Sequence, residues 1–149
     1  MTANICQKMR IALVQLAVSA SKKSNLEHAQ QMIRKAAREF DSNSKSKSLV
    51  VLPECFNSPY GRSIVRSSTP IISSSYLSST QPIDILTYSG TQYFNDYAEE
   101  IPGETSEMLA RTAKEEGVYL VGGSIPERRD GKIYNTSTVF DPAGNMILK

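Results

Sequence analysis

The stretch Ser48-Leu-Val-Val-Leu-Pro-Glu-Cys-Phe-Asn-Ser-Pro-Tyr-Gly61 is the most informative part of the chain for its fold. Residues 49–52 are apolar without polar alternation, which is typical of a short strand covered on both faces in a parallel sheet. Pro53 cannot donate a hydrogen bond to a neighbouring strand, so we expect the strand to end there. Glu54 would then stand just past the C-terminal end of a buried strand, where catalytic groups collect in layered α/β folds.

Glu54 has apolar neighbours, and they allow two interpretations. Leu52, Cys55 and Phe56 flank it, and a carboxyl group among such side chains resists ionisation, which suits a general base near neutral pH. The alternative is an ordinary strand-end acid that caps a loop or pairs with an arginine, since most glutamates are solvated. The local pattern leaves both interpretations open.

The sequence before this stretch predicts a strand and a helix. Residues 9–18 are rich in Ile, Leu and Val, as a strand is. Ser24 and Glu27 then have the spacing of a capping box, with Ser24 as the N-cap. The apolar stripe of the helix follows at helical spacing: Leu26, Ala29, Ile33, Ala36, Ala37 and Phe40. With the strand at 49–52 this makes a β-α-β unit, which favours a parallel, right-handed arrangement.

The sequence after residue 92 predicts a second helix and further strands. Thr105 is a candidate N-cap, and Gly117 marks the end of the helix. Residues 118–121 form a short buried strand, and residues 134–140 alternate like a strand. A turn at 141–145 and a strand from 146 complete a hairpin. The predicted order is β-α-β, an insertion, and then α-β-β-β.

Size, charge and composition exclude several classes of protein. The chain has 149 residues, 40% hydrophobic and 21% charged, with net charge +2, so it fits one folded domain. The charge is too small to indicate nucleic acid or a membrane surface as partner, and no apolar run suits a transmembrane helix or a signal peptide. Cys6 and Cys55 are interpreted as free thiols of a cytoplasmic protein. The single histidine, His28, is interpreted as a surface residue, so no metal site is expected.

Residues 62–92 differ from the rest of the chain, because they carry nine serines and no lysine. We interpret them as a Ser-rich insertion of about thirty residues. It could be specific to a lineage, or non-coding sequence retained in a gene model. A structureless loop of this length is uncommon inside a compact domain, so an ordered lid is the alternative.

The motif at residues 52–60 resembles the first catalytic block of the carbon–nitrogen hydrolase (nitrilase) superfamily, and most of all its omega-amidase, Nit2-like branch. Four further blocks agree in order: Arg10-Ile-Ala-Leu-Val-Gln-Leu16, Tyr97-Ala-Glu-Glu-Ile-Pro-Gly-Glu104, Tyr119-Leu-Val-Gly-Gly-Ser-Ile-Pro-Glu127 and Lys132-Ile-Tyr-Asn-Thr-Ser-Thr-Val-Phe140. The likeness covers residues 8–61 and 93–149. It implies the N-terminal half of an α-β-β-α sandwich, so that residues 8–149 form an incomplete domain of this family.

The resemblance also implies an activity and a catalytic set. Family members hydrolyse amides with a Glu, a Lys and a Cys, need no cofactor and form homo-oligomers, which makes a dimer possible here. In the omega-amidase branch the substrates are dicarboxylate monoamides, and the products are the dicarboxylate and ammonia. The resemblance makes Glu54 the general base and Tyr60 a candidate for the substrate pocket; a loop tyrosine that packs and bonds backbone is the alternative for Tyr60.

The other two catalytic groups are not expected among these residues. In the family the catalytic Lys and Cys follow the last strand present here, and Lys149 corresponds to a lysine that precedes the catalytic one. Cys55 adjoins Glu54 within the family motif, and Cys6 precedes the first strand, so neither is assigned as the nucleophile. Glu127 is interpreted as a structural acid or an acid at the edge of the pocket.

Two functional hypotheses follow. In the first, the chain is a truncated omega-amidase-like hydrolase, inactive alone because the Lys and Cys are missing. In the second, it is a non-catalytic binding or regulatory partner that joins full-length relatives through their dimer surface. An unrelated α/β domain with a chance motif is a third interpretation.

Overall fold

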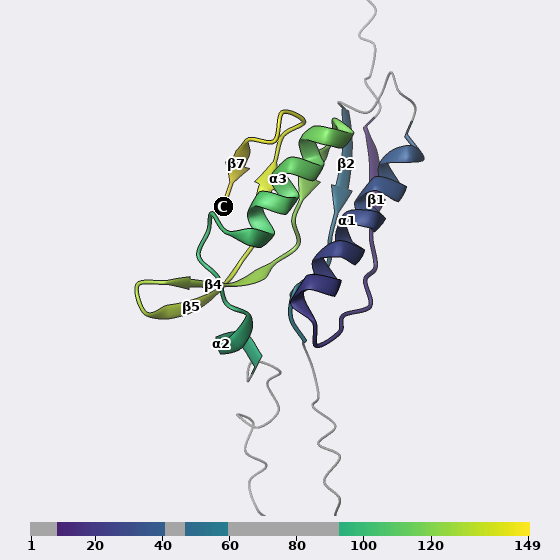
Figure 1. Cartoon of the computed structure of the whole chain (residues 1–149). Helices are drawn as coiled ribbons and strands as arrows, with labels where there is room; N and C mark the ends of the chain where they lie inside the picture. Colours follow the sequence, from purple (N-terminus) through teal and green to yellow (C-terminus); the bar gives the residue numbers. More distant parts are fainter. Residues whose placement is uncertain (1–8, 41–46, 60–92) are drawn as a thin grey trace, which may run out of the picture.

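The computed structural model describes residues 9–40, 47–59 and 93–149 (Figure 1). Five strands form one sheet in the order β1-β2-β3-β6-β7. Strands β1, β2 and β3 are parallel, and β6 and β7 continue the sheet in antiparallel pairs. The bounds are β1 (Arg10–Leu13), β2 (Ser48–Val51), β3 (Tyr119–Val121), β6 (Val139–Phe140) and β7 (Met146–Leu148). The predicted α/β class and the parallel β-α-β unit are confirmed.

Two helices cover one face of this sheet. Helix α1 (Lys22–Arg38) and helix α3 (Glu104–Glu116) lie side by side across it (Figure 1). Val50, Leu120 and Phe140 occupy one registered row of the sheet and are almost completely buried. They pack with the apolar stripes of the helices, which include Ile33 of α1 and Leu109 of α3. Burial of these stripes gives the helices most of their stability.

The opposite face of the sheet is apolar and open among the described residues. Leu13, Val51 and Val121 share one registered row, and Ile11 lies on the same face of β1. Leu13 is 78% exposed and Ile11 is 59% exposed. On β2, Leu49 and Val51 face this side and are only partly buried, whereas Val50 is fully buried against the helices. The prediction that residues 49–52 are covered on both faces is therefore wrong for the part of the chain that the structure describes. The continuous apolar run agrees instead with a sheet built to receive a second layer, as half of a sandwich is.

Both helices begin at different residues from those predicted. Ser21 is the N-cap of α1, and its hydroxyl oxygen accepts a hydrogen bond of 3.2 Å from the backbone N of Ser24. Gly103, two residues before Thr105, is the N-cap of α3, and the hydroxyl of Ser106 accepts from its backbone N at 2.8 Å. The predicted end of α3 is confirmed, since Gly117 caps it in the left-handed conformation.

The C-terminal region divides between two sheets. Strands β4 (Ile125–Arg129) and β5 (Lys132–Thr136) form a separate antiparallel hairpin, which the sequence analysis missed. The strand predicted over 134–140 is therefore wrong as one element, because its first part pairs with β4 and its last part is β6. The predicted hairpin of β6 and β7 is confirmed. A short helix, α2 (Phe94–Tyr97), lies beside β4.

Several predictions fall outside the described residues. They concern Cys6, Tyr60 and the segment 62–92, which the structure does not describe. The interpretations of Tyr60 and of the Ser-rich insertion therefore stay predictions. Within the described ranges, the helices are too short or too polar to cross a membrane.

Candidate active site

Glu54 stands where the sequence predicts it, in a turn directly after β2. The chain continues the sheet to Leu52, whose backbone N donates to the carbonyl oxygen of Val121 at 3.0 Å. It then turns sharply, with Cys55 in the left-handed conformation at φ 49°. The turn lies against the loop after β3: a Cβ atom on Gly123 would stand 2.0 Å from the carbonyl oxygen of Pro53. Only glycine permits this approach, so the backbone position of the Glu54 turn depends on Gly123.

The Glu54 carboxylate is held by one side chain from the β4–β5 hairpin. Nδ2 of Asn135 donates a hydrogen bond of 2.7 Å to Oε1 of Glu54. The Glu54 side chain is exposed, whereas Cys55 and Phe56 beside it are fully buried. The expectation that apolar neighbours enclose this carboxyl group is therefore wrong, because the turn directs those neighbours into the core and leaves Glu54 outside it.

Cys55 is buried beside the carboxylate and is poorly suited to attack a substrate. Its backbone N donates to Oγ of Ser124 at 3.3 Å, and its Sγ lies 4.0 Å from Oδ1 of Asn135. Burial, together with the negative charge of Glu54, raises the pKa of the Cys55 thiol to about 11. The thiolate is the nucleophilic form of cysteine, so these contacts favour the interpretation that Cys55 is not the nucleophile.

The end of the turn is anchored to the starts of both helices. Asn57 is fully buried; its Nδ2 donates to Oγ1 of Thr105 at 3.3 Å, and its carbonyl oxygen accepts from Nδ2 of Asn25 at 3.3 Å. Oδ1 of Asn57 and Oγ of Ser58 are buried with no hydrogen-bond partner among the described residues. The core side of the Glu54 turn is thus fixed to α1 and α3.

Glu127 lies on β4, and its buried carboxylate forms an ion pair with the partly exposed Lys149. Its side chain is 2% exposed; Oε1 bonds Nζ of Lys149, and Oε2 accepts from Oγ1 of Thr136 at 2.6 Å. Burial alone would raise the pKa of this carboxyl group, but the bonds from Lys149 and Thr136 outweigh it and lower the pKa. Lys149 is thereby engaged with Glu127, which links the hairpin to the end of β7.

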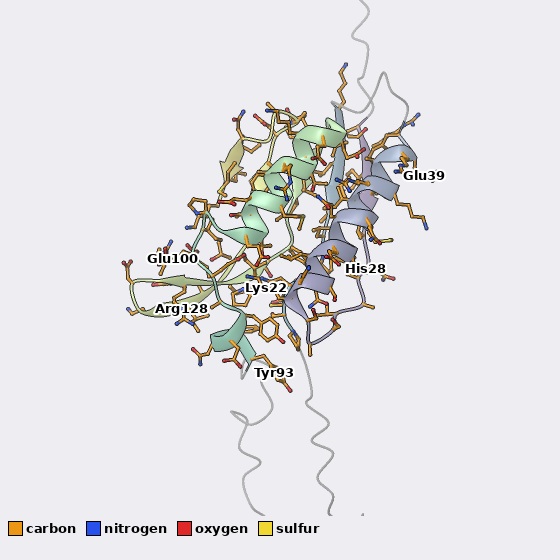
Figure 2. The ribbon with its side chains drawn as sticks, in the orientation of Figure 1. Lys22, His28, Glu39, Tyr93, Glu100 and Arg128 are labelled. Carbon is orange, nitrogen blue, oxygen red and sulfur yellow. The ribbon has the colours of Figure 1, made fainter. Side chains whose placement is uncertain are left out.

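A second carboxylate, Glu99, joins the starts of the helices and was not predicted. It accepts from Nζ of Lys22 at 2.7 Å and from the backbone N of Thr105 at 3.1 Å. Figure 2 shows Lys22 at the first turn of α1, on the side facing the start of α3, where it also pairs with Glu104 at 3.3 Å. A carboxylate near the N-terminus of a helix is stabilised by the helix dipole. We therefore interpret this cluster as a structural contact that holds the starts of α1 and α3 together.

Asn135 is the functional candidate that sequence reasoning missed. It lies 81 residues after Glu54, and no periodicity or spacing connects the two. The one available signal for Asn135 was its place in the block at residues 132–140, which resembles the same family as the block that contains Glu54. In the described ranges no group of three or more His, Cys, Asp or Glu residues is placed to hold a metal ion.

Comparison with known families and proteins identifies relatives along nearly the whole chain. Residues 10–149 match the carbon–nitrogen hydrolase family. The chain is 42% identical to the omega-amidase NIT2 of Xenopus tropicalis over 142 residues, which is 95% of this chain and 39% of that protein. It is 41% identical to the omega-amidase NIT2 of Mus musculus over 94% of this chain and 38% of that protein.

Solved structures agree with the fold. The Nit3 protein of Saccharomyces cerevisiae, a member of branch 10 of the nitrilase superfamily, superposes with a TM-score of 0.62 at 31% identity, covering 93% of this chain and 42% of that one. A carbon–nitrogen hydrolase from Helicobacter pylori gives a TM-score of 0.58 at 22% identity, over 93% of this chain and 37% of that one. The chain thus spans about two-fifths of the length of the curated relatives it matches.

Proposed function

The chain belongs to the carbon–nitrogen hydrolase family, and from this premise we propose that it supplies the general base, Glu54, of an omega-amidase-like hydrolase. The observation that carries the proposal is the geometry of Glu54. The carboxylate follows a parallel strand at its C-terminal end, it is exposed, and Asn135 holds one of its oxygens at 2.7 Å. An exposed, fixed carboxylate can exchange protons with a reactant in front of it.

The proposed reaction is hydrolysis of the terminal amide of a dicarboxylate monoamide. Glu54 takes the proton of a cysteine thiol, and the thiolate attacks the amide carbon while a lysine stabilises the oxyanion. Glu54 returns the proton to the leaving nitrogen, which departs as ammonia and leaves a thioester. Glu54 then takes a proton from water, which attacks the thioester, and the thiol is restored as the dicarboxylate leaves. No metal or cofactor takes part.

The nucleophile and the lysine of this scheme are not assigned to residues described here. Cys55 is buried with a raised pKa, and Lys149 is engaged with Glu127. The resemblance places both groups after the last strand of this sequence. We propose that Tyr60 contributes to the substrate pocket and that the functional protein is a homodimer, both by family resemblance.

A chimera tests the role of Glu54. The 149-residue chain would be continued by the part of the Xenopus tropicalis omega-amidase that follows the matched region. Ammonia release from a dicarboxylate monoamide is measured for the chimera, for Glu54→Gln and for Glu27→Gln, an exposed position on α1. Removal of a general base lowers the rate by about 10²- to 10⁴-fold, so Glu54→Gln should lose activity and Glu27→Gln should keep it. Full activity of Glu54→Gln would overturn the proposal.

The open face of the sheet favours a second candidate function, a binding partner of full-length relatives. Ile11 and Leu13 of β1 remain exposed on this face, and large exposed apolar patches mark interaction sites. Co-purification of the chain with a full-length relative would support this function, provided that Leu13→Lys weakens it. Failure to co-purify would count against it.

A further inference from the structure

We propose that Asn135 is the positioning residue of Glu54: its side-chain amide fixes Oε1 of the carboxylate and leaves Oε2 as the proton acceptor. This inference rests on the proposed role of Glu54 as a base. The contact that carries it is the hydrogen bond of 2.7 Å from Nδ2 of Asn135 to Oε1 of Glu54. A bond from an amide to a carboxylate is charge-assisted and stronger than a bond between neutral groups.

Glu54 needs such a partner because its own surroundings do not fix it. The side chain is exposed, so few packing contacts restrict its rotamers, and glutamate has more side-chain freedom to lose than most residues. Catalysis requires the accepting oxygen to be held close to its productive position. Among the described residues, the amide of Asn135 is the side chain for which a hydrogen bond to the carboxylate is found.

The orientation of the amide is fixed from two sides. Oδ1 of Asn135 lies 4.0 Å from Sγ of Cys55. The Cys55 thiol is protonated at neutral pH, as an ordinary thiol is, and its raised pKa of about 11 keeps it protonated at higher pH as well. The thiol can therefore donate to Oδ1, which turns Nδ2 towards Glu54. The reversed amide would place Oδ1 against the carboxylate and lose both contacts. Cys55 thus has a role beside the base without acting as a nucleophile.

The fold holds Asn135 in place independently of Glu54. Asn135 pairs with Pro126 in the β4–β5 hairpin. The adjacent residue Thr136 is tied to Glu127 at 2.6 Å. On the other side of the site, the backbone N of Cys55 is tied to Oγ of Ser124 at 3.3 Å. Since both backbones are fixed, one amide suffices to orient the carboxylate.

The first test observes the contact in the whole 149-residue chain. The side-chain amide protons of Asn135 are followed by NMR in the wild type and in Glu54→Ala. A bond to a carboxylate separates the two proton resonances, and loss of Glu54 should bring them to the positions of a solvated asparagine. Identical Asn135 resonances in both proteins would overturn the proposal, whatever Glu54 does in catalysis.

The second test measures the consequence in the chimera described above. Asn135→Ala should lower kcat by about 10- to 100-fold, the range of a charge-assisted hydrogen bond. KM should change little, because the proposed role acts on the orientation of Glu54 and not on the binding of substrate. Asn135→Asp puts a second carboxylate against Glu54 and should be at least as damaging at neutral pH. Lys132→Ala, an exposed control on β5, should be neutral.

The outcomes separate this inference from the proposed function. If Glu54→Gln is inactive while Asn135→Ala keeps full kcat, the positioning role is wrong and the base stands. If Glu54→Gln keeps full activity, the proposed function itself is wrong. A loss in Asn135→Ala that appears as lower folded protein, with normal kcat per folded molecule, would reduce Asn135 to a structural role and overturn the inference.

Discussion

Replacement of Gly123 by alanine should displace the Glu54 turn, and Gly117 offers a matched control. Both glycines have positive φ, 60° and 66°, but they differ in surroundings. A Cβ atom at 123 would lie 2.0 Å from the carbonyl oxygen of Pro53, whereas nothing lies within 4 Å of one at 117. Both alanines have a conformational cost of about 1–2 kcal/mol. Only the alanine at 123 must also push backbone away by about 1 Å.

The additional displacement should cost about 1–3 kcal/mol, as overpacking of a rigid site does. We therefore expect Gly123→Ala to lower the free energy of unfolding by roughly 2–5 kcal/mol and Gly117→Ala by roughly 1–2 kcal/mol. Urea unfolding of the two variants, followed by circular dichroism, measures the difference. If the two variants lose the same free energy of unfolding within about 0.5 kcal/mol, the reasoning is refuted, because the clash with the carbonyl oxygen of Pro53 would then have no energetic cost.

Four further predictions concern the ion pair, the Glu127 carboxylate, the buried thiol and the open face. Lys149→Met should lower the free energy of unfolding by about 1–3 kcal/mol, less than for a wholly buried pair because Lys149 is partly exposed. Folding lowers the pKa of Glu127 from 4.5, so the ionised carboxylate stabilises the folded state above pH 4.5, and this stabilisation is lost as the pH falls through the lower folded-state pKa. Acid unfolding curves of Glu127→Gln should lack this pH dependence of stability. In a Cys6→Ser chain, iodoacetamide should alkylate Cys55 at pH 8 about 100-fold faster in urea than in the folded state, and equal rates would contradict its burial and raised pKa. Leu13→Lys should raise the soluble yield and change the free energy of unfolding by less than about 0.5 kcal/mol, and a large loss would mean that this face is covered.

The sequence predicts the parts of the fold that depend on local pattern. The unbroken apolar run before Pro53 identifies β2, and the position of Glu54 follows from it. Gly117 ends α3 because its left-handed conformation is a local requirement. The start of α1 is less determined, since Ser21 and Ser24 can both cap a helix. The structure selects Ser21, and Asn25 then bonds the backbone of Ser19 at 2.8 Å.

The features that the sequence does not predict depend on contacts between distant residues. Apolar residues on β1 and β2 look alike whether or not a second layer covers them, so the open face could not be inferred from their pattern. The bond between Glu54 and Asn135 depends on how the β4–β5 hairpin leaves the main sheet. The exposure of Glu54 has the same origin, because the turn at Cys55, rather than the composition around it, decides which side chains enter the core.

Ammonia release by the purified 149-residue chain, measured with a dicarboxylate monoamide beside the chimera, tests the central claim most directly. That claim is that this chain contributes the base and not the nucleophile. We predict no release by the chain alone, release by the chimera, and loss of that release in the Glu54→Gln chimera. Release by the chain alone that disappears in its own Glu54→Gln variant would contradict the claim, because Cys55 or Cys6 would then have to be the nucleophile.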